Sequence, residues 1–109
     1  MDNLNIPPPN NITAPRVTRD QIDKLMEQVE YRFDRPHGTT STFCHAFLKS
    51  KDGSMFYLTT GHNACISPHN FSEQTGMDLS RAKATHQAYD KLWEFSGFAL
   101  FKEIRDAQY

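Results

Sequence analysis

Apolar side chains near the start of the chain recur at the spacing of an amphipathic helix. Three and four residues separate them, and they are Ile22, Leu25, Met26, Val29 and Phe33. Thr18 and Gln21 have the spacing of a capping box, which marks a helix start. Proline disfavours helical geometry in the residue before it, and glycine tolerates the turn after a helix. The pattern therefore predicts a helix that begins at Thr18 and ends near Pro36-His37-Gly38.

Two runs rich in Thr and aromatic residues follow, over residues 39–50 and 55–66, with Lys51-Asp52-Gly53-Ser54 between them. Asp-Gly between two such runs is a strong signal for a β-hairpin. A two-residue loop at Asp52-Gly53 pairs Lys51 with Ser54 and places Cys44 opposite Gly61. The sequence therefore predicts a hairpin with a defined register.

Side chains alternate along a strand, so this register divides the hairpin into two faces. One face holds Phe43, His45, Phe47, Phe56, Leu58, Thr60 and His62. The other holds Cys44, Ala46, Leu48, Met55, Tyr57, Thr59 and Cys65. Both faces are partly apolar and an isolated hairpin has two open edges, so each face and edge needs a cover. Two helices of the same subunit could supply it, or a second chain; we expect a homo-oligomer built partly through the hairpin.

Helical spacing returns after Ser67-Pro68. Ser67 is positioned to cap a first turn with Pro68 at its first position, and a longer helix is expected from about Ser72 to Phe95. Small residues recur every four positions along it, at Gly76, Ser80, Ala84 and Ala88. They predict a close contact with the hairpin, the first helix or a symmetry mate. Ser96-Gly97 is expected to end this helix before a short final element, for which helix is favoured over strand.

These elements predict an α+β fold in a small single domain over residues 17–109, with an N-terminal helix, a β-hairpin, a long helix and a short C-terminal element. Residues 1–16 contain Pro7-Pro8-Pro9 and few apolar groups, so they are expected to form a disordered, proline-rich arm. In an alternative, Leu4 and Ile6 anchor the arm on a neighbouring subunit.

Composition narrows the function classes. The chain has 109 residues, of which 38% are hydrophobic and 23% charged, with a net charge of -1. The long-range field that draws a protein to nucleic acid or anionic lipid is therefore absent, and any phosphate binding must be local. No run approaches the roughly 20 apolar residues of a membrane span, and no signal-peptide pattern opens the chain. These features predict a cytoplasmic protein with reduced thiols at Cys44 and Cys65.

The order of several short motifs, from Val17 to Ile104, resembles a small phage-protein family known as the gp forty-nine and gene sixty-six family. The motifs begin with Val17-Thr18-Arg19-Asp20-Gln21-Ile22 and Asp34-Arg35-Pro36-His37-Gly38-Thr39-Thr40, and continue with Ala64-Cys65-Ile66-Ser67-Pro68-His69-Asn70-Phe71, Ala82-Lys83-Ala84 and Lys91-Leu92-Trp93-Glu94 followed by Gly97. His62 and His69 stand where the family pattern has acidic residues. The resemblance implies a phage-encoded accessory protein of the host cytoplasm, with no established catalytic residues to transfer.

Metal and thiol chemistry are not favoured by the pattern. Cys44, His45, His62 and Cys65 are zinc ligands by type. The predicted register puts the two histidines on one face and the two cysteines on the other. Cys65 is four residues beyond Gly61, the residue opposite Cys44, so the two cysteines are about 13 Å apart at roughly 3.3 Å per residue. Cys65 has histidines near it in sequence, but no orienting acid or oxyanion-hole pattern accompanies them. We expect no metal, no cofactor and no enzymatic activity, with both thiols packed as small hydrophobic groups.

Anion binding at the joint between hairpin and helix is the interpretation that best fits the chemistry. Backbone N–H groups, hydroxyls, amides and imidazoles gather at this helix start, and Phe71 can stack on a base. The candidate ligand-binding residues are His62, Asn63, Ser67, His69, Asn70, Phe71, Ser72, Arg81 and Lys83. In the alternative interpretation Ser67, Asn70 and Ser72 only cap helices.

Two functions follow as hypotheses. The first is a non-enzymatic homo-oligomer that sequesters a small phosphate-bearing nucleotide, such as a host immune signal, in counter-defence. The second is a protein-interaction module that inhibits or redirects a host protein through the hairpin edge or an aromatic patch with Phe95 and Phe98. Binding to nucleic acid is not favoured, because the basic residues form no stripe.

Overall fold

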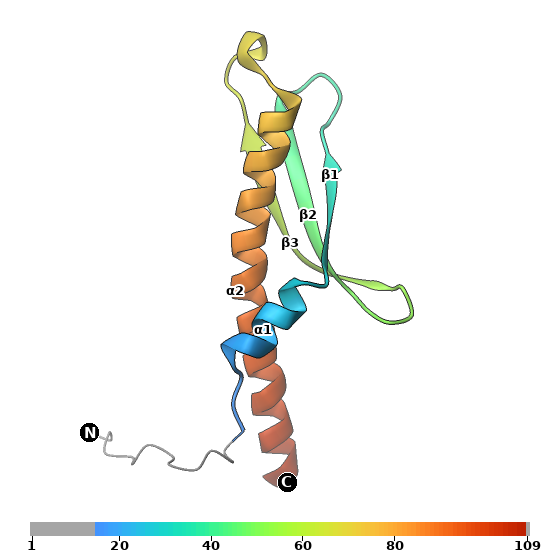
Figure 1. Ribbon diagram of the computed structural model, residues 1–109, viewed down its shortest axis with the longest axis vertical. Coiled ribbons are helices and arrows are strands. Elements are labelled where there is room, and N and C mark those ends of the chain that lie inside the picture. The colour runs from blue at the N-terminus through green and yellow to red at the C-terminus, as the bar shows by residue number, and fades with distance from the viewer. Residues whose placement is uncertain (1–14, 109) are drawn as a thin grey trace, which may run out of the picture.

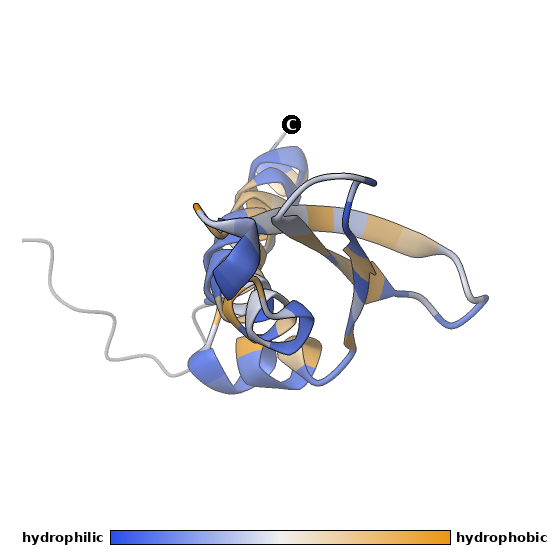
Figure 2. Ribbon diagram, turned by 90° about the horizontal axis from the view of Figure 1, so that it is seen from above, coloured by the Kyte–Doolittle hydropathy of each residue, from blue (hydrophilic) through white to orange (hydrophobic). Residues whose placement is uncertain are grey.

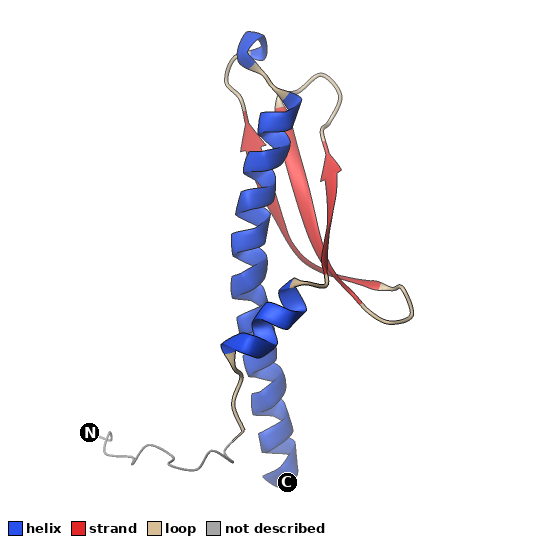
Figure 3. Cartoon of the chain, in the orientation of Figure 1, coloured by secondary structure: helices blue, strands red, loops and turns tan. Residues whose placement is uncertain are grey.

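A computed structural model describes residues 15–108 of the chain. Its elements in order are α1 (Arg19–Met26), β1 (Val29–Asp34), β2 (Ser41–Lys49), β3 (Met55–Ala64), the 3-10 turn η1 (Pro68–Asn70) and α2 (Glu73–Gln108). The predicted α+β class is confirmed (Figures 1 and 3). The predicted arm, residues 1–16, lies almost wholly outside the described residues.

The three strands form one antiparallel sheet in the order β1-β2-β3. Helix α2 runs along one face of this sheet, and α1 packs on the same side, as the view along the long axis shows (Figure 2). The core lies between them and consists of Ile22, Val29, Cys44, Ala46, Leu58, Ala84, Ala88 and Leu92. One face of the sheet is therefore covered within the subunit, and no described helix covers the other.

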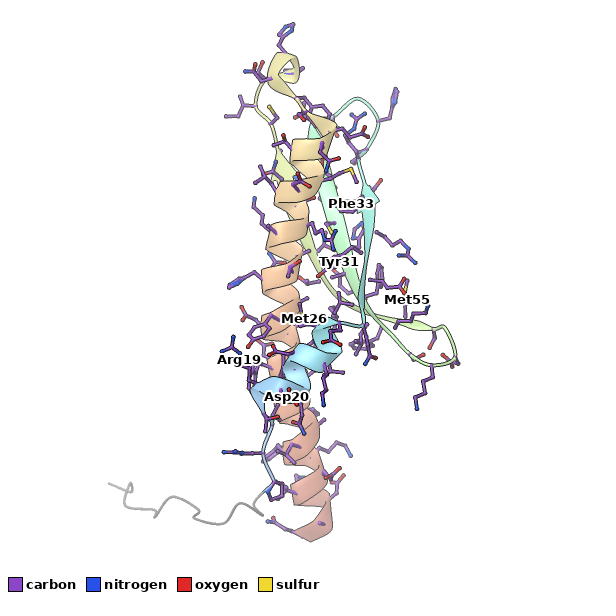
Figure 4. The ribbon with its side chains drawn as sticks, viewed as in Figure 1. Arg19, Asp20, Met26, Tyr31, Phe33 and Met55 are labelled. Atoms are coloured by element: carbon purple, nitrogen blue, oxygen red, sulfur yellow. The ribbon has the colours of Figure 1, made fainter. Side chains whose placement is uncertain are left out.

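Helix α1 begins as the sequence predicts. The Thr18 backbone N–H donates to Gln21 Oε1 at 3.0 Å, and the Gln21 N–H donates to Thr18 Oγ1 at 3.2 Å, so both halves of the capping box are formed. The predicted end near Pro36 is wrong, because α1 stops at Met26, which lies near α2 (Figure 4).

The segment after α1 is a strand because its side chains also alternate with a period of two. Val29 and Tyr31 point to the α2 side, whereas Glu30 and Arg32, which alternate with them, point to the open side. Pairing with β2 satisfies the backbone groups along its inner edge, and Tyr31 Oη lies 2.9 Å from Thr85 Oγ1 on α2. The predicted two-stranded hairpin is thus part of a three-stranded sheet.

The hairpin loop has three residues where two were predicted. The Ser50 N–H donates to the Ser54 carbonyl at 2.9 Å, and Gly53 has a φ of +90°, which suits glycine. A bulge at Leu58 compensates for the extra loop residue. Beyond it, Cys44 lies opposite Gly61, as predicted.

The bulge corrects the predicted faces near the loop. Leu48 pairs with Phe56 on the α2 side, and Leu58 is buried there. Met55 and Tyr57 lie on the open face, where Tyr57 is opposite Phe47. Four side chains of β3 therefore lie on the face opposite to the predicted one, because one inserted residue reverses the alternation.

Helix α2 is continuous through Ser96-Gly97, so the predicted break and separate final element are wrong. A glycine in a helix costs only about 1 kcal/mol relative to alanine, which a long helix tolerates. The small residues Gly76, Ser80, Ala84 and Ala88 are buried and face the sheet. The small residues therefore contact the hairpin, which is one of the three partners predicted for them. No helix between residues 15 and 108 has an apolar stretch long enough to cross a membrane.

Candidate functional site

The joint between β3 and α2 lies at the end of the molecule shown uppermost in Figure 1. Pro68 is at the first position of η1, as predicted, but Ser67 makes no side-chain capping bond. Ser72 caps α2, because its Oγ accepts from the Thr75 N–H at 3.3 Å. The joint is also tied to the β1–β2 connection, since the Cys65 N–H donates to the Thr40 carbonyl at 3.3 Å and Thr40 Oγ1 donates to the Cys65 carbonyl.

A pocket of about 250 Å³ opens beside this joint. Its lining comes from the end of β3 and the residue after it, from the last residue of η1 and the two that follow, and from the first turns of α2. The residues are Asn63, Ala64, Cys65, Asn70, Phe71, Ser72, Thr75, Gly76 and Leu79. Amide, hydroxyl and thiol groups thus meet an aromatic ring in one cavity. Such a mixture of apolar surface and a few polar groups is typical of small-molecule sites.

Phe71 is half-buried, and the Arg35 guanidinium lies 5.0 Å from the centre of its ring. Arg35 comes from the β1–β2 connection, where its Nη1 donates to the Thr39 carbonyl at 2.8 Å. The guanidinium is therefore held in place by a backbone contact and by a cation-π contact with the ring. It brings a positive charge to the ring of Phe71, which lines the pocket.

Four of the nine predicted ligand-binding residues line this pocket: Asn63, Asn70, Phe71 and Ser72. Ser67 and His69 belong to the η1 region and do not line it. Of the six predicted ligand-binding residues at the joint, four therefore line the pocket and two do not.

The other three predicted residues lie elsewhere. The His62 ring stacks on Phe43 at 4.5 Å on the open face of the sheet. Lys83 Nζ donates to the His62 carbonyl at 2.8 Å, which fastens α2 to β3. Arg81 lies on the other side of α2, with its guanidinium 4.7 Å from the centre of the Tyr31 ring.

Sequence reasoning missed Arg35 and Thr75. Thr75 lies three residues after Ser72. The backbone N–H at that position is the one that bonds to a capping side chain, so the place of Thr75 beside Ser72 could have been inferred from the sequence. Arg35 is 36 residues before Phe71 in the chain, and no periodicity connects the two. Only the sheet pairing brings its loop to the joint.

The charges around the pocket are mixed. The first turn of α2 contains Glu73, and this carboxylate already interacts favourably with the helix dipole. An anion is therefore better placed toward Arg35 than directly on the helix start.

Cys44 and the two histidines of the sheet lie on opposite faces of it. Burial raises the pKa of the Cys44 thiol, which keeps it protonated and a weak nucleophile. Cys65 Sγ donates to the Ser67 carbonyl at 3.1 Å. His45 and His62 lie on the open face, away from Cys44. Residues 15–108 contain no group of three or more His, Cys, Asp or Glu side chains that could hold a metal ion.

A second, larger groove of about 630 Å³ runs along α2 beside α1. It is lined by Met26, Asp78, Arg81, Ala82, Thr85, His86 and Tyr89. Its surface is mainly apolar, and Arg81 is occupied by its contact with Tyr31. This groove is larger and more apolar than the pocket at the joint, and Arg81 is the one predicted ligand-binding residue in its lining.

No curated protein and no solved structure is significantly similar to the chain. A family profile, in contrast, matches residues 17–104, which is most of its length. The chain belongs to the phage protein (N4 Gp49/phage Sf6 gene 66) family.

Proposed function

We propose that this phage protein is a non-enzymatic, oligomeric binder that sequesters a small nucleotide-type ligand, such as a host immune signal. The observation that carries the proposal is the pocket at the joint, which Asn63, Asn70, Phe71 and Ser72 line. The Arg35 guanidinium lies 5.0 Å from the centre of the Phe71 ring. An aromatic ring stacks on a base, a guanidinium pairs with a phosphate, and amides bond to base edges. These are the three contacts that a nucleotide needs.

The size of the pocket bears on how such a ligand is held. At about 250 Å³ it lies below the range of roughly 300 to 1,000 Å³ typical of sites that enclose a whole drug-sized ligand. One base or one phosphate fits, and a dinucleotide extends beyond it. A second subunit would then cover the remainder, which is why the proposal joins ligand binding to oligomerisation.

Calorimetry against cyclic dinucleotides and ADP-ribose-type nucleotides tests the proposal. We expect at least one of them to bind with a Kd below about 1 μM. Replacing Phe71 by Ala removes a stack worth about 1 to 3 kcal/mol, so the Kd should rise at least tenfold. Ile66→Ala is the matched control, because Ile66 is close in sequence, is fully exposed and does not line the pocket. If no member of the panel binds more tightly than micromolar, the nucleotide proposal is wrong.

The alternative is a module that binds a host protein, and the exposed rings of Phe95 and Phe98 favour it. A pull-down from host lysate, with native mass spectrometry of the eluate, separates the two functions. A sequestering protein retains a small molecule, whereas an inhibitor retains a stoichiometric protein.

A further inference from the structure

The last third of α2 extends beyond the sheet (Figure 1). The helix has 36 residues, or about 54 Å at 1.5 Å per residue, whereas the longest strand has 10 residues, or about 33 Å. Large apolar side chains recur every three residues on this extension, and together we call them the C-terminal ridge: Phe95, Phe98, Phe101 and Ile104. Their exposed fractions are 41%, 64%, 60% and 40%.

A helix of this kind needs a packing partner. Isolated helices shorter than about 12 to 15 residues are marginal in water even with favourable sequences. Beyond Phe95 this extension contains Gly97 and two phenylalanines, which are weak helix formers. Phe95 has an edge-on contact with Phe56 of the sheet at 5.7 Å, whereas Phe98 and Phe101 are 64% and 60% exposed. Burying the other ridge side chains against a partner would therefore stabilise this end of the helix.

We infer that the C-terminal ridge binds the same ridge of a second copy, with the two helices antiparallel. At 3.6 residues per turn Phe98 and Phe101 lie on the same side of the helix, so an antiparallel pair places Phe98 against the second copy's Phe101. Phe95 and Ile104 then lie at the two margins of the contact. A self-complementary patch of this kind is what a two-fold interface requires. Rows of side chains three residues apart also pack into the grooves of a facing helix.

The charges at the ends of the ridge fit the same arrangement. Glu94 and Arg105 are equally far from the midpoint of the ridge, so an antiparallel pair places Glu94 of each helix opposite Arg105 of the other. Within its own helix Glu94 lies 3.8 Å from Lys91, and Arg105 lies 3.2 Å from Asp106. Across residues 94–108 the charges are Glu94, Lys102, Glu103, Arg105 and Asp106, which nearly cancel. Two such segments therefore do not repel each other strongly.

The area of the ridge also suits a dimer. The exposed parts of the three phenylalanines, at about 200 Å² for a full side chain, and of Ile104 give roughly 400 Å² of apolar surface per copy. A standard interface buries about 800 Å² per partner, of which a little over half is non-polar. The ridge thus supplies the apolar centre, and the charged flanks supply the rim.

This inference deepens the oligomeric part of the proposed function, but its test needs no ligand. Sedimentation velocity of the full chain at about 1 to 100 μM should show a dimer or a multiple of dimers. Phe98→Glu and Phe101→Glu each place two like charges in the centre of the interface, so the dissociation constant should rise at least tenfold. Ile66→Glu, which adds the same charge at a fully exposed site, should leave it unchanged.

Charge reversal tests the antiparallel orientation. Glu94→Arg and Arg105→Glu should each weaken assembly, and the double variant should restore it. The inference is overturned if the wild-type chain is a monomer throughout the range, or if Phe98→Glu acts no more strongly than Ile66→Glu. It is also overturned if Leu4→Ser/Ile6→Ser weakens assembly as much as Phe98→Glu, because the N-terminal arm would then be the occupant of the ridge.

Discussion

Replacing Gly61 by Ala is expected to separate β3 from α2. A Cβ atom at Gly61 would lie 2.5 Å from the Ala84 backbone nitrogen and 3.1 Å from its Cα, and still closer to the Ser80 carbonyl oxygen. All three are backbone atoms of α2, so no side-chain rotation relieves the contact. The helix has to move away from the strand.

The size of the effect follows from that movement. Restoring an ordinary contact of 3.4 Å to the Ala84 nitrogen requires a shift of about 0.9 Å, and the closer Ser80 carbonyl oxygen requires somewhat more. A gap of that size forfeits about a quarter to a half of the dispersion attraction across the interface, and overpacked cores lose about 1 to 3 kcal/mol or more. Alanine recovers about 0.5 to 1 kcal/mol as the better strand residue. Because three backbone atoms clash, we take the upper part of the overpacking cost, about 2 to 3 kcal/mol. The expected net loss is then about 1 to 2.5 kcal/mol, equivalent to a fall in Tm of roughly 5 to 20 °C.

Urea denaturation followed by far-UV circular dichroism measures this loss, at one protein concentration for all variants. Gly97→Ala is the matched control, because a Cβ at Gly97 meets nothing within 4 Å and should add about 0.5 to 1 kcal/mol of helix stability. Gly61→Ala/Ala84→Gly should be no more stable than Gly61→Ala, since it leaves the backbone contacts in place. A Gly61→Ala protein within about 0.5 kcal/mol of wild type would refute the reasoning, and rescue by Ala84→Gly would assign the clash to a side chain.

Three further predictions concern single side chains. Thr42 Oγ1 is buried without a hydrogen-bond partner in the described part of the chain, so Thr42→Val should stabilise the fold by about 1 kcal/mol in urea denaturation, and a loss would show that the hydroxyl has a partner. Hydrogen bonds from Ser50 and Ser54 lower the pKa of Asp52 to about 2, so the ionised carboxylate stabilises the folded state. This stabilisation is present above about pH 4 and is lost as the pH falls toward 2. It should be absent when the stability of Asp52→Asn is followed over the same acid titration. Thr18→Ala removes the cap of α1 and should cost about 1 kcal/mol, whereas Thr18→Asn, which can still cap, should cost much less in the same measurement.

Local chemistry in the sequence was sufficient for several features. The capping box at Thr18, the Asp52-Gly53 turn signal and Pro68 at the start of η1 each act within a few residues of the chain. The line of small residues on α2 likewise identifies its buried face, because only small side chains permit so close an approach to Gly61. Phe71 and Asn70 were found as pocket residues for the same reason, since they flank a predicted helix start.

Only the tertiary structure decided the remainder. Val29 and Phe33 satisfy a helical and a strand period equally, and pairing with β2 selected the strand. The bulge at Leu58 depends on how the hairpin lies on α2, and it reversed the faces of four residues. The contact of Arg35 with Phe71 joins two loops that are neighbours only through the sheet. Short-range signals determine where elements begin and turn, whereas the free energy of burying one face against another determines which period is used and which distant loops meet.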